Sequence, residues 1–501
     1  MRHGPRQLPP GPNDECARGP VASSCRKACK TVRLPGETRW PWVHGRASAT
    51  RAIPGGIGLP VRPRSGEIAQ TSALDGESLQ DLCKSSTMQG SKSPGSSMSR
   101  SEALRFLNLA HFFDHFFLLI FPTAALAIAP SWNMGYADVL VLGTPMYVMF
   151  ALGTLPAGWL GDTVDRMMLI AVFFLGCGGS SLWIAMSDGP MTMAFGLASL
   201  GLFAAIYHPV GLAHVTHIGL RTGRALAVNG VFGNMGLAGA AAVTGLLAGF
   251  LGWKWAFVLP GALSILIGLL LMKRNGTTPG AVPPAVHEDS GAAPKCDRGT
   301  QVTVFGIVCA IALFGGLIFN AVTISLPKFF DERLAGAGDD LAWIGVSAGL
   351  VFAVAAFAQL PVGELLDRIG ARSVLIVLLA SQATLFVLLA HASGWAALAL
   401  ALLLVTFIFA EIPVTSWLLG RYLDRGFRSR AFSVEYVLSL GIGSIAVPLI
   451  ALLHKRGFGF EAQFPGLALT ALIILLAAAF LPRHIRAGSR RAAEAAASPG
   501  N

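Results

Sequence analysis

Two octapeptides, LPAGWLGD at residues 155–162 and LPVGELLD at residues 360–367, share the same spacing of Leu, Pro, Gly, Leu and Asp. A second pair, GRALAVNGV from Gly223 and SRAFSVEYV from Ser429, recurs at almost the same offset, and the tripeptide LIF occurs at 119–121 and again at 317–319. Similar segments at a nearly constant offset indicate an internal duplication. We therefore expect two related halves.

The sequence around these repeats consists of apolar runs of about 20 residues separated by short polar or Gly/Pro breaks, each run long enough to cross a bilayer as a helix. The 501-residue chain is 53% hydrophobic and only 13% charged, whereas soluble proteins carry about 25% charged residues. A soluble globular protein is thereby excluded. The twelve predicted spans lie near 104–129, 136–160, 167–187, 190–214, 223–250, 253–272, 301–326, 341–366, 372–392, 394–420, 430–453 and 462–482.

The spans and the duplication together predict an all-α polytopic membrane protein with two pseudo-symmetric six-helix bundles. The bundles cover 101–272 and 301–482, and a cytoplasmic linker at 273–300, rich in Pro, Gly and charges, joins them. A cytoplasmic tail follows at 483–501. Parallel repeats of this kind are typical of secondary transporters that bind substrate between the halves.

The formal net charge of +11 is concentrated at the N-terminus. Residues 1–100 hold 15 Lys and Arg against 7 Asp and Glu, and the other 401 residues hold 23 against 20. We interpret 1–100 as a disordered basic extension, or as sequence upstream of a translation start at Met98, and not as a nucleic-acid-binding region. Predicted loops on one side carry 17 Lys and Arg against five on the other. This bias predicts that both termini lie in the cytoplasm. We also expect the protein to be located in the cell (inner) membrane.

The loops after the second and eighth spans, GWLGDTVDRM and GELLDRIGAR, resemble the cytoplasmic signature of the major facilitator superfamily. Within that superfamily, HFFDHFFLLIFPTAALAIAP at 111–130 and IYHPVGLAHVTHIGLRTGRALAVNGVFGNMG at 206–236 resemble the fosmidomycin-resistance-type branch. The resemblance implies the major facilitator fold and export of a drug or metabolite. The fifth span lacks the Gly-Pro of that branch, which leaves uptake open.

The first span places His111, Asp114 and His115 on one helical stripe. Ionisable groups inside a span are costly and usually face the bundle interior or a water-filled cavity. The seventh span has Cys309, Ala312 and Leu313 at the corresponding positions, and this difference favours a functional role over an architectural one. The alternative is a polar lock between helices in which each group is satisfied.

The tripeptide YHP at 207–209 in the fourth span is matched by EIP at 411–413 in the tenth. Each proline frees a backbone carbonyl and bends its helix. No basic residue lies within nine positions of Glu411, and a lone carboxylate in hydrocarbon is stable only with a bound proton. We predict Asp114 and Glu411 as protonation sites, followed by His208. The alternative for His208 is a bond to the carbonyl that its own proline frees.

The two signature loops predict a cytoplasmic gate. Asp162 and Asp367 end their spans where a carboxylate can meet a helix N-terminus of the opposite half or a nearby guanidinium. The resemblance implies that these contacts close the cytoplasmic side in the outward-facing state, and the alternative is an anchor that only sets topology. The predicted gate residues are Gly158, Asp162, Arg166, Gly363, Asp367 and Arg368.

Five other polar residues of the spans are predicted to have an ion-pair partner or to contact the cavity. We expect Glu435 to pair with a neighbouring arginine such as Arg430, five positions earlier. Four residues are candidate polar contacts in the cavity: Tyr207, Asn229, Asn320 and Gln359.

The sequence lacks the common motifs for nucleotide binding and for metal binding. No phosphate-binding G-x-x-x-x-G-K-[ST] loop occurs, so an ATP-driven pump is not supported. Neither H-E-x-x-H nor paired C-x-x-C motifs occur, so we expect no metal, no cofactor and no enzymatic activity.

The predicted function is proton-coupled secondary transport of a small molecule by alternating access, most simply as an efflux antiporter. The expected partners are the substrate, protons and the lipid bilayer, with the chain acting as a monomer. The alternatives are an uptake symporter, or a non-transporting scaffold or sensor with the same fold.

Overall fold

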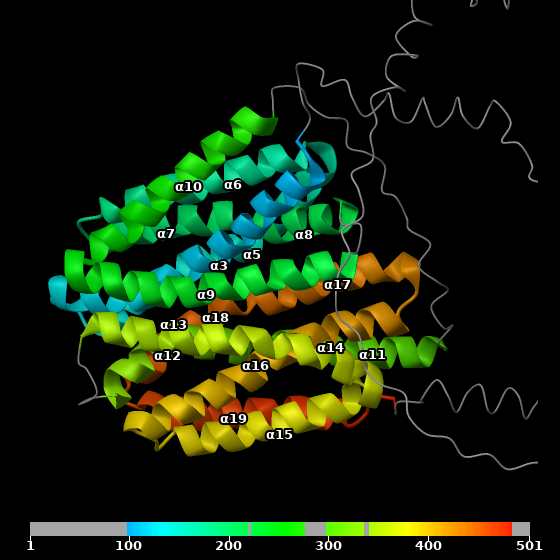
Figure 1. Ribbon diagram of the computed structural model, residues 1–501. Helices are drawn as coiled ribbons and strands as arrows, with labels where there is room; N and C mark the ends of the chain where they lie inside the picture. Colours follow the sequence, from blue (N-terminus) through cyan, green and yellow to red (C-terminus); the bar gives the residue numbers. More distant parts are fainter. Residues whose placement is uncertain (1–97, 219–221, 276–296, 335–339, 483–501) are drawn as a thin grey trace, which may run out of the picture. The chain divides into compact units, whose positions relative to one another are not determined.

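The computed structural model describes residues 98–218, 222–275, 297–334 and 340–482, and these are helical almost throughout (Figure 1). Twelve helical segments in this part of the chain are long and apolar enough to cross a membrane. The predicted all-α class and number of spans are therefore confirmed. The tail at 483–501, most of the linker at 273–300 and nearly all of the extension at 1–100 lie outside the described residues.

The first six spans, coloured blue to green in Figure 1, occupy Arg100–Asn275. Two of them are interrupted helices, in which α4 and η1 lead into α5, and α7 leads into α8. The elements are α3 (Arg100–Ser131), α4 (Tyr136–Leu140), η1 (Val141–Gly143), α5 (Thr144–Thr163), α6 (Arg166–Ala185), α7 (Pro190–Ala204), α8 (Tyr207–Ile218), α9 (Thr222–Leu251) and α10 (Trp253–Asn275).

The second six spans begin at Arg298. The seventh contains one π-helical segment, η2, and the eighth and eleventh are also interrupted. The elements are α11 (Arg298–Ala310), η2 (Ile311–Gly315), α12 (Gly316–Arg333), α13 (Leu341–Ala355), η3 (Ala356–Ala358), α14 (Gln359–Ile369), α15 (Ala371–Leu389), α16 (Gly394–Tyr422), α17 (Arg425–Gly441), α18 (Gly443–Lys455) and α19 (Gly459–Ala478).

Short polar side chains begin several of these helices. The side chains of Ser99, Asp165, Asp297 and Asp340 each accept a hydrogen bond from a backbone N–H of the first turn. Such caps satisfy amide groups that have no partner within the helix. At Asp297 the hydrogen bonds from the hydroxyl and the amide of Thr300 hold the pKa of the carboxyl below its usual range.

The fourth span breaks at Ala205 and Ile206, directly before α8. Pro209 has no N–H, so the carbonyl of Ala205, four residues earlier, loses its helical partner. The predicted distortion at Pro209 is therefore present. Pro413 lies inside the unbroken helix α16, so the corresponding proline of the second half does not interrupt its span.

Contacts within each half bring distant spans together. In the first half α3 lies against α9 and α6 against α10, and in the second half α15 lies against α16 and α19. Between the halves α9 runs beside α13 (Figure 1), and α18 contacts α4 and α5. The structure therefore pairs the two halves along α9 and α13.

Glycine permits the close approach of α9 and α13. A Cβ atom on Gly345 would lie 2.5 Å from the carbonyl oxygen of Ala241 and 2.7 Å from Cα of Gly245. Real Cβ atoms do not approach backbone this closely, so a side chain at this position would force the helices apart. Small residues at such crossings are common in membrane proteins, where packing drives helix association.

An ion pair joins the halves at one end of the spans. Nζ of Lys455 lies 2.7 Å from Oδ1 of Asp138, and Nζ of Lys328 lies 5.3 Å from the ring centre of Tyr136. Among ion pairs between described side chains, only Lys455–Asp138 links one half to the other. We call this the clamped end.

Replacing Gly345 by leucine should weaken the contact between α9 and α13. We expect a loss of about 1–3 kcal/mol in the free energy of unfolding, because the added side chain overpacks the crossing. Thermal unfolding of the detergent-purified protein measures this as a lower midpoint. The control is Gly306→Leu, which gains the same helix propensity at an exposed position with no atom within 4 Å of its Cβ. Equal midpoints for the two variants would contradict the close packing.

Candidate functional site

The candidate site is built on α3, where His111 and Asp114 are buried and His115 is partly buried. The stripe predicted from the sequence faces α8 and α9, which both contact α3. Gly233 of α9 leaves room for the first imidazole, since a Cβ there would lie 2.6 Å from Nε2 of His111. The imidazole is thus enclosed between spans of the first half.

The break before α8 places His208 opposite Asp114. Nε2 of His208 lies 3.1 Å from Oδ2 of Asp114, and both side chains are buried. The two atoms are within ion-pair distance but are not aligned for a hydrogen bond, and Nδ1 of His208 also lacks a hydrogen-bond partner among the described groups. His208 therefore does not bond the carbonyl that Pro209 frees, which was the alternative left open by the sequence.

Asn229 of α9 joins three spans of the first half. Its side-chain oxygen accepts a hydrogen bond from the hydroxyl of Tyr207 at 2.9 Å, and its side-chain nitrogen donates to Oδ1 of Asn108 at 3.0 Å. Its backbone oxygen lies 2.8 Å from Nδ1 of His111. Because a carbonyl oxygen can only accept a hydrogen bond, Nδ1 of His111 carries the proton of the neutral imidazole. Nε2 then keeps its lone pair.

Three imidazoles gather at this point, and we call His111, His115 and His208 the histidine cluster. The ring centres are 4.9 Å apart for His111 and His115, 5.4 Å for His111 and His208, and 5.5 Å for His115 and His208. One ring nitrogen from each lies within 4.8 Å of the others. Chemically, the cluster can accept a proton or supply nitrogen ligands to a cation.

The second half contributes a separate buried carboxylate, Glu411 of α16. The side-chain amide of Gln382 donates a hydrogen bond of 2.9 Å to Oε2 of Glu411. Oε1 is buried without a hydrogen bond in the described part of the chain, and it faces Gly315 at the end of η2. Glu411 thus has a neutral amide, and no arginine or lysine, as its partner among the described residues.

Glu435 of α17 is a buried carboxylate whose partner was predicted wrongly. The hydroxyl of Thr415 donates a hydrogen bond of 2.9 Å to its Oε1, whereas Arg430 is exposed. The next residue, Tyr436, places its ring centre 6.1 Å from that of His208 across the two halves. The alignment of GRALAVNGV with SRAFSVEYV, which sets Asn229 opposite Glu435, was the signal that could have identified this position.

The other two predicted cavity contacts make no hydrogen bond to the histidine cluster in the described part of the chain. The side-chain amide of Asn320 donates to the carbonyl of Gly316 at 2.8 Å within α12. Gln359 lies beside Gly230 of α9, and its Nε2 is buried without a hydrogen-bond partner among the described groups. Of the four predicted cavity contacts, the structure therefore brings Tyr207 and Asn229 to the cluster, whereas Asn320 and Gln359 bond to none of its members among the described residues.

The predicted gate residues contact partners within their own half. Oδ1 of Asp162 lies 3.5 Å from the guanidinium of Arg166. The indole of Trp417 donates to Oδ1 of Asp367 at 2.9 Å, and Arg368 pairs with Glu364 one turn earlier. Of the two predicted kinds of partner for Asp162, the structure shows the nearby guanidinium.

The two glycines predicted for the gate, Gly158 and Gly363, differ in their surroundings. Gly158 packs against Pro209, since a Cβ there would lie 3.5 Å from Cβ of that proline, whereas Gly363 has no such neighbour within 4 Å. The first of the two predicted gate loops is therefore adjacent to the break that positions His208.

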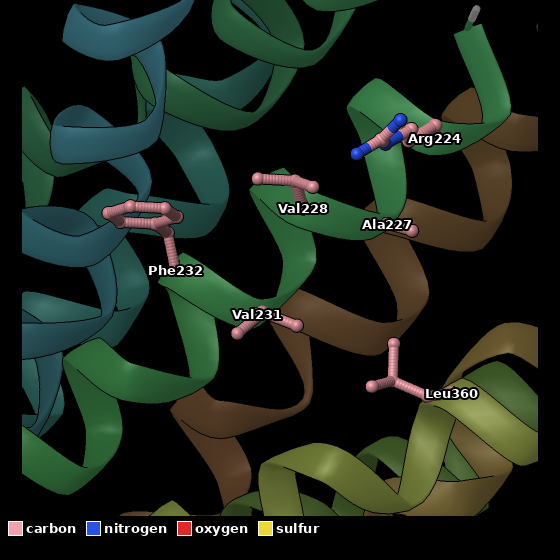
Figure 2. Close-up of a pocket in the computed structure, with 6 residues that line it drawn as sticks. All are labelled: Arg224, Ala227, Val228, Val231, Phe232 and Leu360. Atoms are coloured by element: carbon pink, nitrogen blue, oxygen red, sulfur yellow. The ribbon is translucent and has the colours of Figure 1, made fainter. Parts of the chain in front are cut away.

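A shallow groove of about 360 Å³ lies between α9 and α14 (Figure 2). Five of its lining residues follow one face of α9, and Leu360 of α14 faces them. Except for Arg224 the lining is apolar: Ala227, Val228, Val231, Phe232 and Leu360. None of the residues predicted for the proton or substrate path lines this groove, so it is not the candidate site.

Solved structures with the same arrangement of helices are membrane transporters. A bacterial homolog of the human lysosomal transporter Spinster, in an inward-facing and unoccupied conformation, aligns with a TM-score of 0.59 at 16% identity, covering 78% of this chain and 97% of that one. A D-xylose-proton symporter aligns with a TM-score of 0.61 at 16% identity, covering 76% and 97%. At these identities the likeness shows the fold.

Sequence comparison extends the likeness to a family. The puromycin resistance protein of Streptomyces alboniger is 33% identical over 162 residues, which cover 31% of this chain and only 29% of that protein. The profile of the Major Facilitator Superfamily matches residues 107–418, more than half of the chain and parts of both halves. The chain therefore belongs to the Major Facilitator Superfamily.

Proposed function

We propose that this chain is a proton-coupled antiporter that exports a small molecule across the cell (inner) membrane, with both termini in the cytoplasm. Membership of the superfamily supports transport. The name of the puromycin resistance relative supports efflux. The fosmidomycin-resistance-type branch remains part of this proposal, on the motifs at 111–130 and 206–236.

The observation that carries proton coupling is the environment of Glu411. A buried carboxylate whose partner is a neutral amide is costly when ionised inside a span, because no cation offsets its charge. A bound proton removes that cost. When one conformation opens the site to water, the carboxylate is solvated and releases the proton, so protonation becomes coupled to the conformational cycle.

The first half supplies the remainder of the proposed path. Asp114 and the histidine cluster lie opposite Tyr436 of the second half, at a contact that changes when the halves rock. Tyr207 and Asn229 hold the cluster in place through their hydrogen bonds. We place the proton or substrate path along these residues, with Glu411 on the opposite side and Asn320 and Gln359 as further polar contacts.

The gate is proposed at Asp162 and Asp367, at the end of the spans away from the clamp. In the present conformation the Lys455–Asp138 pair holds the halves together at the clamped end, while Asp162 is exposed and bonds within its own half. When the cycle reverses, Asp162 and Asp367 would take partners across the halves and the clamp would open.

The variant Glu411→Gln should abolish proton-coupled flux. Glutamine retains the size and the hydrogen-bonding capacity of a protonated glutamate but cannot release a proton, so the cycle loses its coupling. Proteoliposomes loaded with a pH-sensitive dye measure this directly, with puromycin as the first compound of a substrate panel. We expect substrate and protons to move in opposite directions in the wild type.

The matched control is Glu102→Gln, a carboxylate at the start of α3 with a surface ion pair to Arg274, and it should leave the flux unchanged. Substrate and protons moving in the same direction would establish uptake symport instead. A proton-driven flux that survives Glu411→Gln would remove this residue from the coupling mechanism. If the protein transports no compound of the panel and residues 1–97 bind a partner, the scaffold alternative is favoured.

The variant Asp162→Asn should reduce the transport rate about 10- to 100-fold at normal expression, because a charge-assisted contact is worth roughly 1.5–3 kcal/mol when the gate closes. The rate of substrate efflux from energised cells measures the effect. Asp188→Asn, at an exposed aspartate of the α6–α7 loop paired with Lys254, serves as the control. A wild-type rate in Asp162→Asn would leave this residue only a role in topology.

A further inference from the structure

The spacing of the histidine cluster approaches that of a metal site. One ring nitrogen of each histidine lies within 4.8 Å of the others. Two imidazoles on a tetrahedral zinc ion, at Zn–N distances of about 2.0–2.1 Å, place their nitrogens about 3.4 Å apart. Shifts of up to about 0.8 Å in each ring would reach that spacing. His111 and His115 are four residues apart on α3, the spacing at which two helical histidines share one metal ion.

In two of the three rings, one nitrogen lies against a neighbouring oxygen and the other makes no hydrogen bond in the described part of the chain. The backbone oxygen of Asn229 takes the Nδ1 proton of His111 and leaves Nε2 free. Asp114 lies beside Nε2 of His208 and leaves Nδ1 buried without a hydrogen-bond partner among the described groups. Metal-bound histidines usually contact a carbonyl or a carboxylate through the second nitrogen in this way.

The charge of the site favours a cation. Asp114 is completely buried, and neither of its carboxylate oxygens has a hydrogen bond among the described groups. The buried residues in the described part of the chain include no lysine and no arginine. Metal ligation requires the neutral form of His208, and a neutral imidazole 3.1 Å from Oδ2 of Asp114 leaves the charge of that carboxylate uncompensated. A divalent ion bound to the adjacent imidazoles would offset this charge.

We infer that His111, His115 and His208 form a binding site for a divalent late first-row transition metal ion, typified by Zn²⁺. Imidazole nitrogen suits Zn²⁺, Ni²⁺ and Cu²⁺, whereas Mg²⁺ and Ca²⁺ require several oxygen ligands. Three histidines leave a fourth coordination position open to water or to an atom of a substrate. Asp114 and the carbonyl of Asn229 orient two of the rings.

Metal binding would have a consequence for transport, and this part rests on the proposed function. The ion occupies the histidines beside Asp114 that we place on the proton or substrate path. A bound Zn²⁺ should therefore inhibit flux, and the inhibition should disappear with the ligands.

The test uses the full-length chain, purified without a histidine tag and stripped with a chelator. Titration of Zn²⁺ against a chromophoric chelator should show one tight site per chain. The key variant is His115→Gln, since it removes one ligand but leaves the Asp114–His208 contact and the His111–Asn229 bond intact. We expect its affinity to fall about 100-fold or more. The control His391→Gln, at an exposed histidine, should bind like the wild type.

Replacement of Zn²⁺ by Co²⁺ checks the geometry without any variant, because tetrahedral Co²⁺ absorbs visible light much more strongly than octahedral Co²⁺. An intense visible band that is lost in His115→Gln supports the site. The inference is overturned if the wild type binds no Zn²⁺ above the His115→Gln background, or if both proteins bind it equally. Tight binding without inhibition of flux would retain the metal site and contradict only its place on the transport path.

Discussion

The arrangement of the first half depends on satisfying polar groups that lie inside membrane spans. Asn229 is the centre of this arrangement, since its side chain and backbone bond to residues of α3 and α8. In hydrocarbon no water replaces a lost partner, so each of these bonds fixes the rotation of one helix against another. The position of Asp114 against His208 follows from that fixed rotation.

The two halves use equivalent positions for different chemistry. Tyr207 and Asn229, which bond to each other in the first half, correspond in the repeat to Glu411 and Glu435 in the second. The carboxylates do not bond to each other but to Gln382 and Thr415. A duplicated scaffold thus carries a neutral pair on one side and two separate acidic groups on the other. The first half thereby holds the histidine cluster beside Asp114, while the second half holds two carboxylates with neutral partners.

The lengths of the spans, the polar stripe of α3 and the break near Pro209 could be predicted because each depends on residues close together in the chain. The partners of Glu435 and the cluster of three histidines could not. Thr415 and Glu435 lie in different spans, as do His115 and His208, and helical periodicity shows which residues share a face but not which face meets another helix. A search for metal motifs within one segment therefore overlooks His208.

The sequence by itself determined twelve spans, their division into two related halves and the presence of ionisable residues inside them, because hydropathy and repetition are properties of the chain alone. Only the tertiary structure decided which of those residues meet. The crossing of α3, α8 and α9, made close by glycines such as Gly233, brings three imidazoles and Asp114 together. Helix rotation and crossing are set by packing among many side chains at once, so contacts between spans arise only when all the helices are in place.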